Sequence, residues 1–106
     1  MNRQEHLLTI LIEECAEVQK AATKALRFGL RDIKPGGNET NEDDISRELN
    51  DVYAMVEMLN YDGLQLHPDV GLRAEKKNRV EKYLLYSEKR GTLDDFDYET
   101  DADIGN

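Results

Sequence analysis

The sequence has no tryptophan, a single cysteine, two prolines and no long apolar run. The lone Cys15 excludes a disulfide within the chain, and we expect it to be a small buried residue of a helix. No apolar stretch approaches the roughly 20 residues of a membrane span, and no signal-peptide pattern opens the chain, so we expect a cytoplasmic protein. Isoleucine, valine and threonine do not gather in alternating runs, which favours an all-α protein over one with strands.

Basic residues are also few, since 14 lysines and arginines face 23 acidic residues and give the 106-residue chain a net charge of −9. Residues 92–106 contain six acidic and no basic residues and so account for −6, leaving −3 for residues 1–91. We expect residues 1–91 to form one folded domain and residues 92–106 to be an acidic, disordered tail. A body so close to neutral lacks the positive stripe that a nucleic-acid polymer would need, and nothing in it indicates a membrane partner.

Three helices are expected from the apolar spacing and from the residues that flank it. The first begins after Asn2 and stops before Gly29, and Asn41 or Asp43 is expected to cap the second. Between them lies a long loop with Pro35-Gly36-Gly37 at its centre, which could close over a ligand. The three expected helices span about 3–28, 42–61 and 69–90, with a short extra helix near residues 64–68.

Two acidic pairs mark the first two helices. Glu14 and Glu17 are three residues apart, as are Glu48 and Asp51, so each pair shares one helix face. Apolar residues at three- and four-residue spacing continue the same faces and define two buried seams. The seam positions are Leu7, Leu11, Glu14, Val18, Ala21 and Ala25 on the first helix, and Ile45, Glu48, Val52, Met55 and Leu59 on the second.

Carboxylates on a buried seam lose hydration and repel one another, and a bound cation can offset that cost. Antiparallel packing of the two helices would bring Glu14 and Glu17 opposite Glu48 and Asp51. No histidine or cysteine recurs at ligand spacing, so all the donors would be oxygen atoms. Such a donor set favours Mg²⁺, Mn²⁺ or Ca²⁺ over zinc or iron.

Basic residues follow both acidic segments. Lys20, Lys24 and Arg27 lie on the second half of the first helix, where they could pair with Glu17 or face an anionic substrate. A denser basic cluster lies on the third helix and would face either solvent or the same anion. It consists of Lys76, Lys77, Arg79 and Lys82.

The acidic segments together resemble the signature of the MazG-like, all-α nucleoside triphosphate pyrophosphohydrolases. Glu13-Glu14-x-x-Glu17 matches its first half and Glu48-x-x-Asp51 its second, while Lys77-Asn78-Arg79 is similar to the basic segment of that family. The resemblance covers roughly residues 5–91. The loop between the acidic pairs is longer than usual, and Asn50 stands where a small residue is common.

This resemblance implies a helical bundle completed by homo-oligomerisation, as a homodimer or homotetramer with three main helices per chain. It implies hydrolysis of nucleoside triphosphates, most often deoxynucleotides, to the monophosphate and pyrophosphate. Mg²⁺, with Mn²⁺ as a substitute, would be held by Glu14, Glu17, Glu48 and Asp51. Glu13 would act as the base or orient the attacking water, and the substrate would be bound by Lys24, Lys77, Asn78 and Arg79.

Three other functions remain open at this point. One is phosphoribosyl-ATP pyrophosphohydrolase, whose family shares the acidic helices but has a lysine-rich approach to the first acidic segment that is absent here. Another is a non-catalytic acidic helical module that binds a protein partner through its tail and charged faces. The third is a divalent-ion buffer, which would bind Ca²⁺ without any effect of nucleotides.

Overall fold

The computed structural model describes residues 1–94, and most of the predicted disordered tail, residues 92–106, lies outside that range. The described residues contain three helices and no strand, which confirms the all-α prediction. No helix among them is long and apolar enough to cross a membrane. The helices are α1 (Arg3–Phe28), α2 (Asn41–Tyr61) and α3 (Val70–Lys89).

The chain divides into two compact units after Leu66. The first unit holds α1, α2 and the loop that joins them, and the second holds α3. Asp69 caps α3 by accepting a hydrogen bond of 2.9 Å from the Leu72 backbone N–H, and no residue of that helix is buried. The acidic pairs both belong to the first unit.

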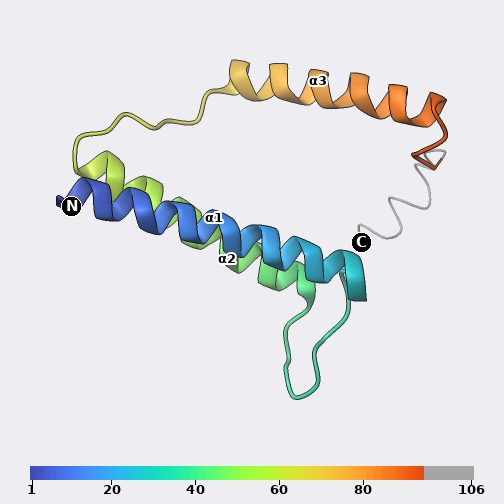
Figure 1. The fold of residues 1–106 in the computed structure, drawn as a ribbon, viewed down its shortest axis with the longest axis horizontal. Coiled ribbons are helices and arrows are strands. Elements are labelled where there is room, and N and C mark those ends of the chain that lie inside the picture. Colours follow the sequence, from blue (N-terminus) through green and yellow to red (C-terminus); the bar gives the residue numbers. More distant parts are fainter. Residues whose placement is uncertain (95–106) are drawn as a thin grey trace. The chain divides into compact units, whose positions relative to one another are not determined.

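Helices α1 and α2 form an antiparallel hairpin, with the joining loop at one end (Figure 1). Its core is small, consisting of Leu7, Met55 and Leu59 with Leu11 and Leu64 packed against them. Every position of the two predicted seams is buried or half-buried, which confirms the side of each helix that faces the other. The periodicity of the apolar residues therefore predicted the helix faces that position the site.

Both ends of the first helix form as the sequence predicts. The Asn2 side chain accepts a hydrogen bond of 2.8 Å from the Glu5 N–H, and Glu5 accepts one of 3.1 Å from the Asn2 N–H. This reciprocal capping box satisfies two backbone donors that the helix itself leaves unpaired. At the other end the Gly29 N–H donates to the Ala25 carbonyl, where α1 stops.

The second helix begins one residue earlier than predicted, and its cap is Thr40 rather than Asn41 or Asp43. The Thr40 hydroxyl accepts a hydrogen bond from the Asp43 N–H, and the Asp43 carboxylate accepts one from the Thr40 N–H, which lowers the pKa of Asp43. Asn41 has a different role inside the helix. Its buried amide donates a hydrogen bond of 2.8 Å to the Gly29 carbonyl and so holds the two ends of the loop together.

The end of α2 explains why the extra helix predicted near residues 64–68 is absent. Gly63, at a φ of 107°, lets the Leu64 N–H reach back to the Leu59 carbonyl, a helix-ending motif that also packs Leu64 on the core. The Asn60 side chain then binds both the N–H and the carbonyl of Leu66. Because these bonds hold the backbone in a non-helical path, the prediction of a helix there was wrong.

One residue predicted to be buried is exposed. Cys15 lies on the solvent side of α1, so the expectation of a buried thiol was wrong. Tyr53 on α2 also has 56% of its surface exposed. Both lie outside the seam, on helix faces that the hairpin alone does not cover.

Candidate metal centre and adjoining basic pocket

Three carboxylates from the two helices meet on the hairpin. Glu14 of α1 and Glu48 and Asp51 of α2 each offer one oxygen, and these three oxygens lie within 4.8 Å of one another. Glu14 and Glu48 are half-buried at the seam, whereas Asp51 is exposed. The predicted meeting of the acidic helices is thus observed for three of the four expected residues, which we call the acidic cluster.

The acidic cluster disfavours its own full ionisation. Partial burial, followed by the negative charges of Asp51 and Glu48, raises the pKa of Glu14 above its ordinary value. Glu17 and Glu13 add smaller contributions of the same sign. A divalent cation would reverse this effect, because its charge favours the ionised form of every carboxylate around it.

The donor set fits a hard cation. Two oxygens bound to one ion at about 2.1–2.5 Å can lie no further apart than twice that length, so a spread of up to 4.8 Å requires little side-chain movement. All three donors are carboxylate oxygens, as Mg²⁺, Mn²⁺ and Ca²⁺ prefer. Three protein ligands also leave positions for water or for phosphate oxygens, which is how Mg²⁺ is usually bound in phosphate-transfer sites.

A polar cavity of about 230 Å³ adjoins the acidic cluster and shares Glu48 with it. It lies between the second half of α1, the loop and the first turns of α2. Its basic lining residues are Lys20 and Lys24 of α1, Lys34 of the loop and Arg47 of α2. We call this cavity the basic pocket.

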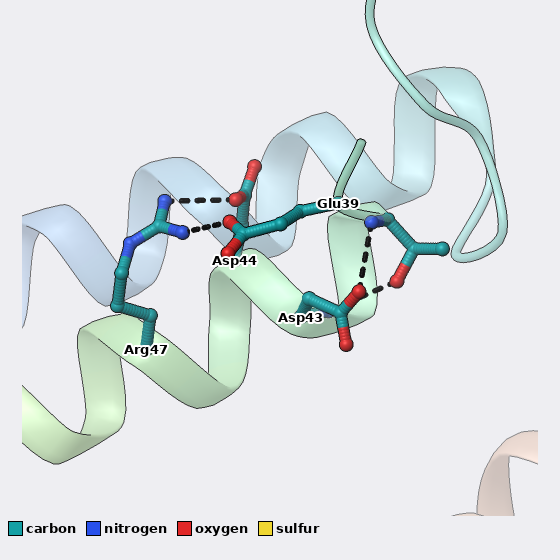
Figure 2. Close-up of polar contacts among 5 residues, drawn as sticks. Glu39, Asp43, Asp44 and Arg47 are labelled. Atoms are coloured by element: carbon teal, nitrogen blue, oxygen red, sulfur yellow. Dashed lines mark hydrogen bonds and ion pairs between the residues drawn. The ribbon is translucent and has the colours of Figure 1, made fainter. Parts of the chain in front are cut away.

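The four cations of the basic pocket differ in their partners. Arg47 is paired with two carboxylates (Figure 2). It donates a hydrogen bond of 2.8 Å to Asp44 and a second hydrogen bond to Glu39, and these contacts raise the pKa of Arg47. By contrast, Lys20, Lys24 and Lys34 form no ion pair with any residue in the described part of the chain. The lining also holds four carboxylates, so its formal charges balance at four positive and four negative; they are Glu17, Glu39, Asp44 and Glu48.

Several predicted site residues lie elsewhere than expected or are not brought to the cluster. Glu17 lies one turn further along α1 than Glu14 and lines the basic pocket instead. Glu13 is exposed on α1, and its negative charge makes a small contribution to the raised pKa of Glu14. Lys24 is in the pocket, in keeping with a substrate-binding role. The residues predicted on α3, Lys77, Asn78 and Arg79, belong to the second unit, and their approach to the cluster stays a prediction.

Lys34 and Arg47 line the pocket but were not among the predicted site residues. The sequence carries a signal for each of them. Lys34 immediately precedes Pro35-Gly36-Gly37, a turn sequence that presents its neighbours outward. Arg47 follows Asp44 by three residues, the spacing of an ion pair on one helix face.

The raised pKa of Glu14 leads to a prediction about stability. A carboxyl with a raised pKa stabilises the metal-free fold when protonated, below its unfolded value of 4.5, and this contribution is lost as pH rises through the folded pKa. At pH 7, Glu14→Gln should therefore raise the melting temperature in EDTA and reduce the further rise that Mg²⁺ produces. Calorimetric melts with and without Mg²⁺ test this, with Glu57→Gln, outside the cluster, as the control. A lower melting temperature for Glu14→Gln in EDTA would contradict the electrostatic account.

Comparison with protein-family models, with curated proteins and with solved structures finds no match to this chain. The resemblance to MazG-like pyrophosphohydrolases stays a prediction from the acidic and basic segments.

Proposed function

We propose that this chain hydrolyses nucleoside triphosphates, deoxynucleotides foremost, to nucleoside monophosphate and pyrophosphate in a reaction that requires Mg²⁺ or Mn²⁺. One observation carries the proposal. A cluster of three carboxylates suited to a divalent cation adjoins a charge-balanced pocket in which three lysines form no ion pair within the described residues. A metal–polyphosphate complex has both charges in the same arrangement, and nucleoside triphosphates are its commonest form.

The reaction breaks a phosphoanhydride bond with water as the nucleophile. Bound Mg²⁺ would supply neutralisation of phosphate oxygens and a lowered pKa for the attacking water. Glu14, Glu48 and Asp51 would hold it. Glu17 lines the pocket that adjoins the cluster and is proposed as a further ligand, while Glu13 is proposed to accept a proton from the water. Lys24 would neutralise phosphate charge along the substrate.

We further propose that a second copy of the chain completes the helical bundle, as a homodimer or homotetramer. The core of the hairpin is small, and large apolar side chains remain uncovered on it. Leu26 is 88% exposed and Tyr61 is 91% exposed. Large apolar side chains that gather on a protein surface mark sites of protein–protein contact. Light scattering should therefore give at least twice the 12.2 kDa mass of one chain, and a monomer would contradict this proposal.

The proposed activity is tested by pyrophosphate release from a panel of ribo- and deoxynucleoside triphosphates, with Mg²⁺ and with EDTA. We expect release with Mg²⁺ alone, and a nucleoside monophosphate as the second product. The same samples should show a higher melting temperature with Mg²⁺ and nucleotide, by linkage. Protein that is folded, yet silent across the panel and unshifted in its melt, would contradict the proposal and favour a partner-binding module.

A further inference from the structure

We propose that one face of α3 is a docking surface for the acidic segment of residues 94–103 of the same chain. This docking is independent of the proposed activity, because it involves the second unit alone. The surface combines cations with two tyrosine rings at helical spacing, and we call it the basic–aromatic face. Its residues are Lys76, Arg79, Lys82, Tyr83 and Tyr86.

The basic–aromatic face follows from the spacing of its residues along α3. They are linked by steps of three and four residues, which place side chains on one side of a helix. A step of two residues turns the helix by about 200°, so Glu81 and Glu88 lie on the other side. Glu75 is the one acidic residue of α3 beside the face. Positive charge and aromatic surface are thus gathered on one side of the helix.

A groove of about 410 Å³ runs along this face, lined by Arg79, Lys82, Tyr83 and Tyr86. Its lining is almost wholly apolar, as the tyrosine rings and the alkyl stems of the two cations provide. Tyr83 is 70% exposed and Tyr86 is 62% exposed. The groove therefore offers an aromatic side chain an uncovered apolar surface with positive charges beside it.

The positive charges of α3 have no partner within residues 1–94. Residues 70–91 contain seven basic and three acidic residues, a formal net charge of +4. None of these basic residues forms an ion pair in the described part of the chain. Such an excess attracts a negatively charged segment, and a segment tethered nearby has the advantage of a high effective concentration.

The sequence of residues 94–103 complements the face in both charge and aromatic content. It contains six acidic residues and no basic one, and Phe96 and Tyr98 stand between its carboxylates. Carboxylates form charge-assisted hydrogen bonds with lysine and arginine. Aromatic rings pack against tyrosine and over a guanidinium group. The chain therefore supplies its own ligand for the basic–aromatic face.

The end of α3 sets where this segment begins. The Thr92 N–H donates a hydrogen bond of 3.0 Å to the Ser87 carbonyl, and the Gly91 N–H donates one of 3.1 Å to the Glu88 carbonyl. With Gly91 at a φ of 80°, these are the two bonds of a Schellman motif, which ends the helix. The Thr92 hydroxyl also donates to the Ser87 carbonyl, at 3.2 Å. The chain therefore leaves the helix axis at Gly91 instead of continuing along it.

The segment is long enough to cover the whole face. Lys76 lies 15 residues before Gly91, which is about 22 Å along the helix at 1.5 Å per residue. Thr100 lies nine residues after Gly91, and nine extended residues span up to about 30 Å. A chain that turns back at Gly91 can therefore bring Thr100 to the level of Lys76.

The test is paramagnetic NMR on the full isotope-labelled chain, with a nitroxide attached at Thr100→Cys in a background that carries Cys15→Ala. We expect the nitroxide to broaden backbone signals around Lys76 more than signals around Arg90. An undocked segment gives the reverse order, because its label stays closest to the point of attachment. That reverse order would overturn the proposal and leave the face to a separate acidic partner.

Charge reversal on α3 supplies a matched pair of variants. Lys82→Glu, in the groove, should lower the ratio of docked to free segment roughly 5-fold, because an attraction is replaced by a repulsion. Lys77→Glu makes the same change on the other side of α3 and should alter the ratio less than about 2-fold. Equal losses in the two variants would show attraction to the overall charge of the helix and overturn docking on this face. Circular dichroism should show both variants equally helical.

A mixed sample identifies which chain supplies the segment. Isotope-labelled chain without nitroxide is combined with unlabelled chain that carries the nitroxide at Thr100→Cys. We expect no broadening of the α3 signals in this mixture. Broadening there would overturn docking within one chain and assign the face to the acidic segment of a second copy.

Discussion

Replacing Glu48 by glutamine should lower Mg²⁺-dependent turnover by at least about 100-fold while leaving the helical structure intact. Glu48 belongs to the acidic cluster and also lines the basic pocket, so its carboxylate lies where the cation and the phosphates would meet. Glutamine keeps the shape of the side chain but removes the charge that holds the cation. Steady-state pyrophosphate release, with far-UV circular dichroism on the same samples, measures both parts.

Glu57→Gln is the matched control, because Glu57 lies on the same helix, is exposed and is outside both the cluster and the pocket. It should retain wild-type turnover within about 2-fold. If raising the Mg²⁺ concentration restores part of the activity of Glu48→Gln, the defect is one of metal affinity. Activity of Glu48→Gln equal to that of the control would remove the acidic cluster from the reaction.

The second large effect is expected in the core, where Leu59→Ala should cost roughly 3 kcal/mol of unfolding free energy. Leu59 is the largest fully buried side chain of the described residues, at 0% exposure, and it forms the small core with Leu7 and Met55. For a domain of this size such a loss lowers the melting temperature by more than about 10 °C. Thermal and urea unfolding of the full chain measure it.

Leu72→Ala is the control for this prediction, because it makes the same chemical change on α3 at a side chain that is 64% exposed. It should change the unfolding free energy by less than about 0.5 kcal/mol. A loss below about 1 kcal/mol for Leu59→Ala would contradict the packing of α1 on α2.

Local rules predicted most of the fold. Asn2 and Gly29 marked the ends of α1 correctly because capping and glycine conformation depend on a few neighbouring residues. The start of α2 was misassigned because Asn41 is an equally good cap by type, and only the loop closure recruits it to Gly29. The burial of Cys15 failed for a similar reason. Its position on the helix, outside the seam, outweighs the usual preference of cysteine for the interior.

The site was predictable where it depends on helix periodicity. Glu14, Glu48 and Asp51 meet because each lies at or beside a seam position. Antiparallel pairing of α1 and α2 brings these positions to the same level along the helix axes. Glu17, which shares a helix face with Glu14, lies one turn further along α1 and lines the pocket, so its role as a metal ligand stays a prediction. Lys34 could not be placed from spacing, because a loop residue reaches a helix face only through its particular turn and bridge.

The central claim, that the acidic cluster holds the divalent cation, is tested most directly by titrating Mn²⁺ into isotope-labelled protein and following NMR line broadening. We expect the first sub-stoichiometric Mn²⁺ to broaden signals around Glu14, Glu48 and Asp51, and Glu48→Gln to abolish this selectivity. The acidic C-terminal residues 94–103 provide an internal comparison, because their sequence carries six carboxylates. Broadening that begins there, with the signals of the hairpin unaffected, would contradict the claim.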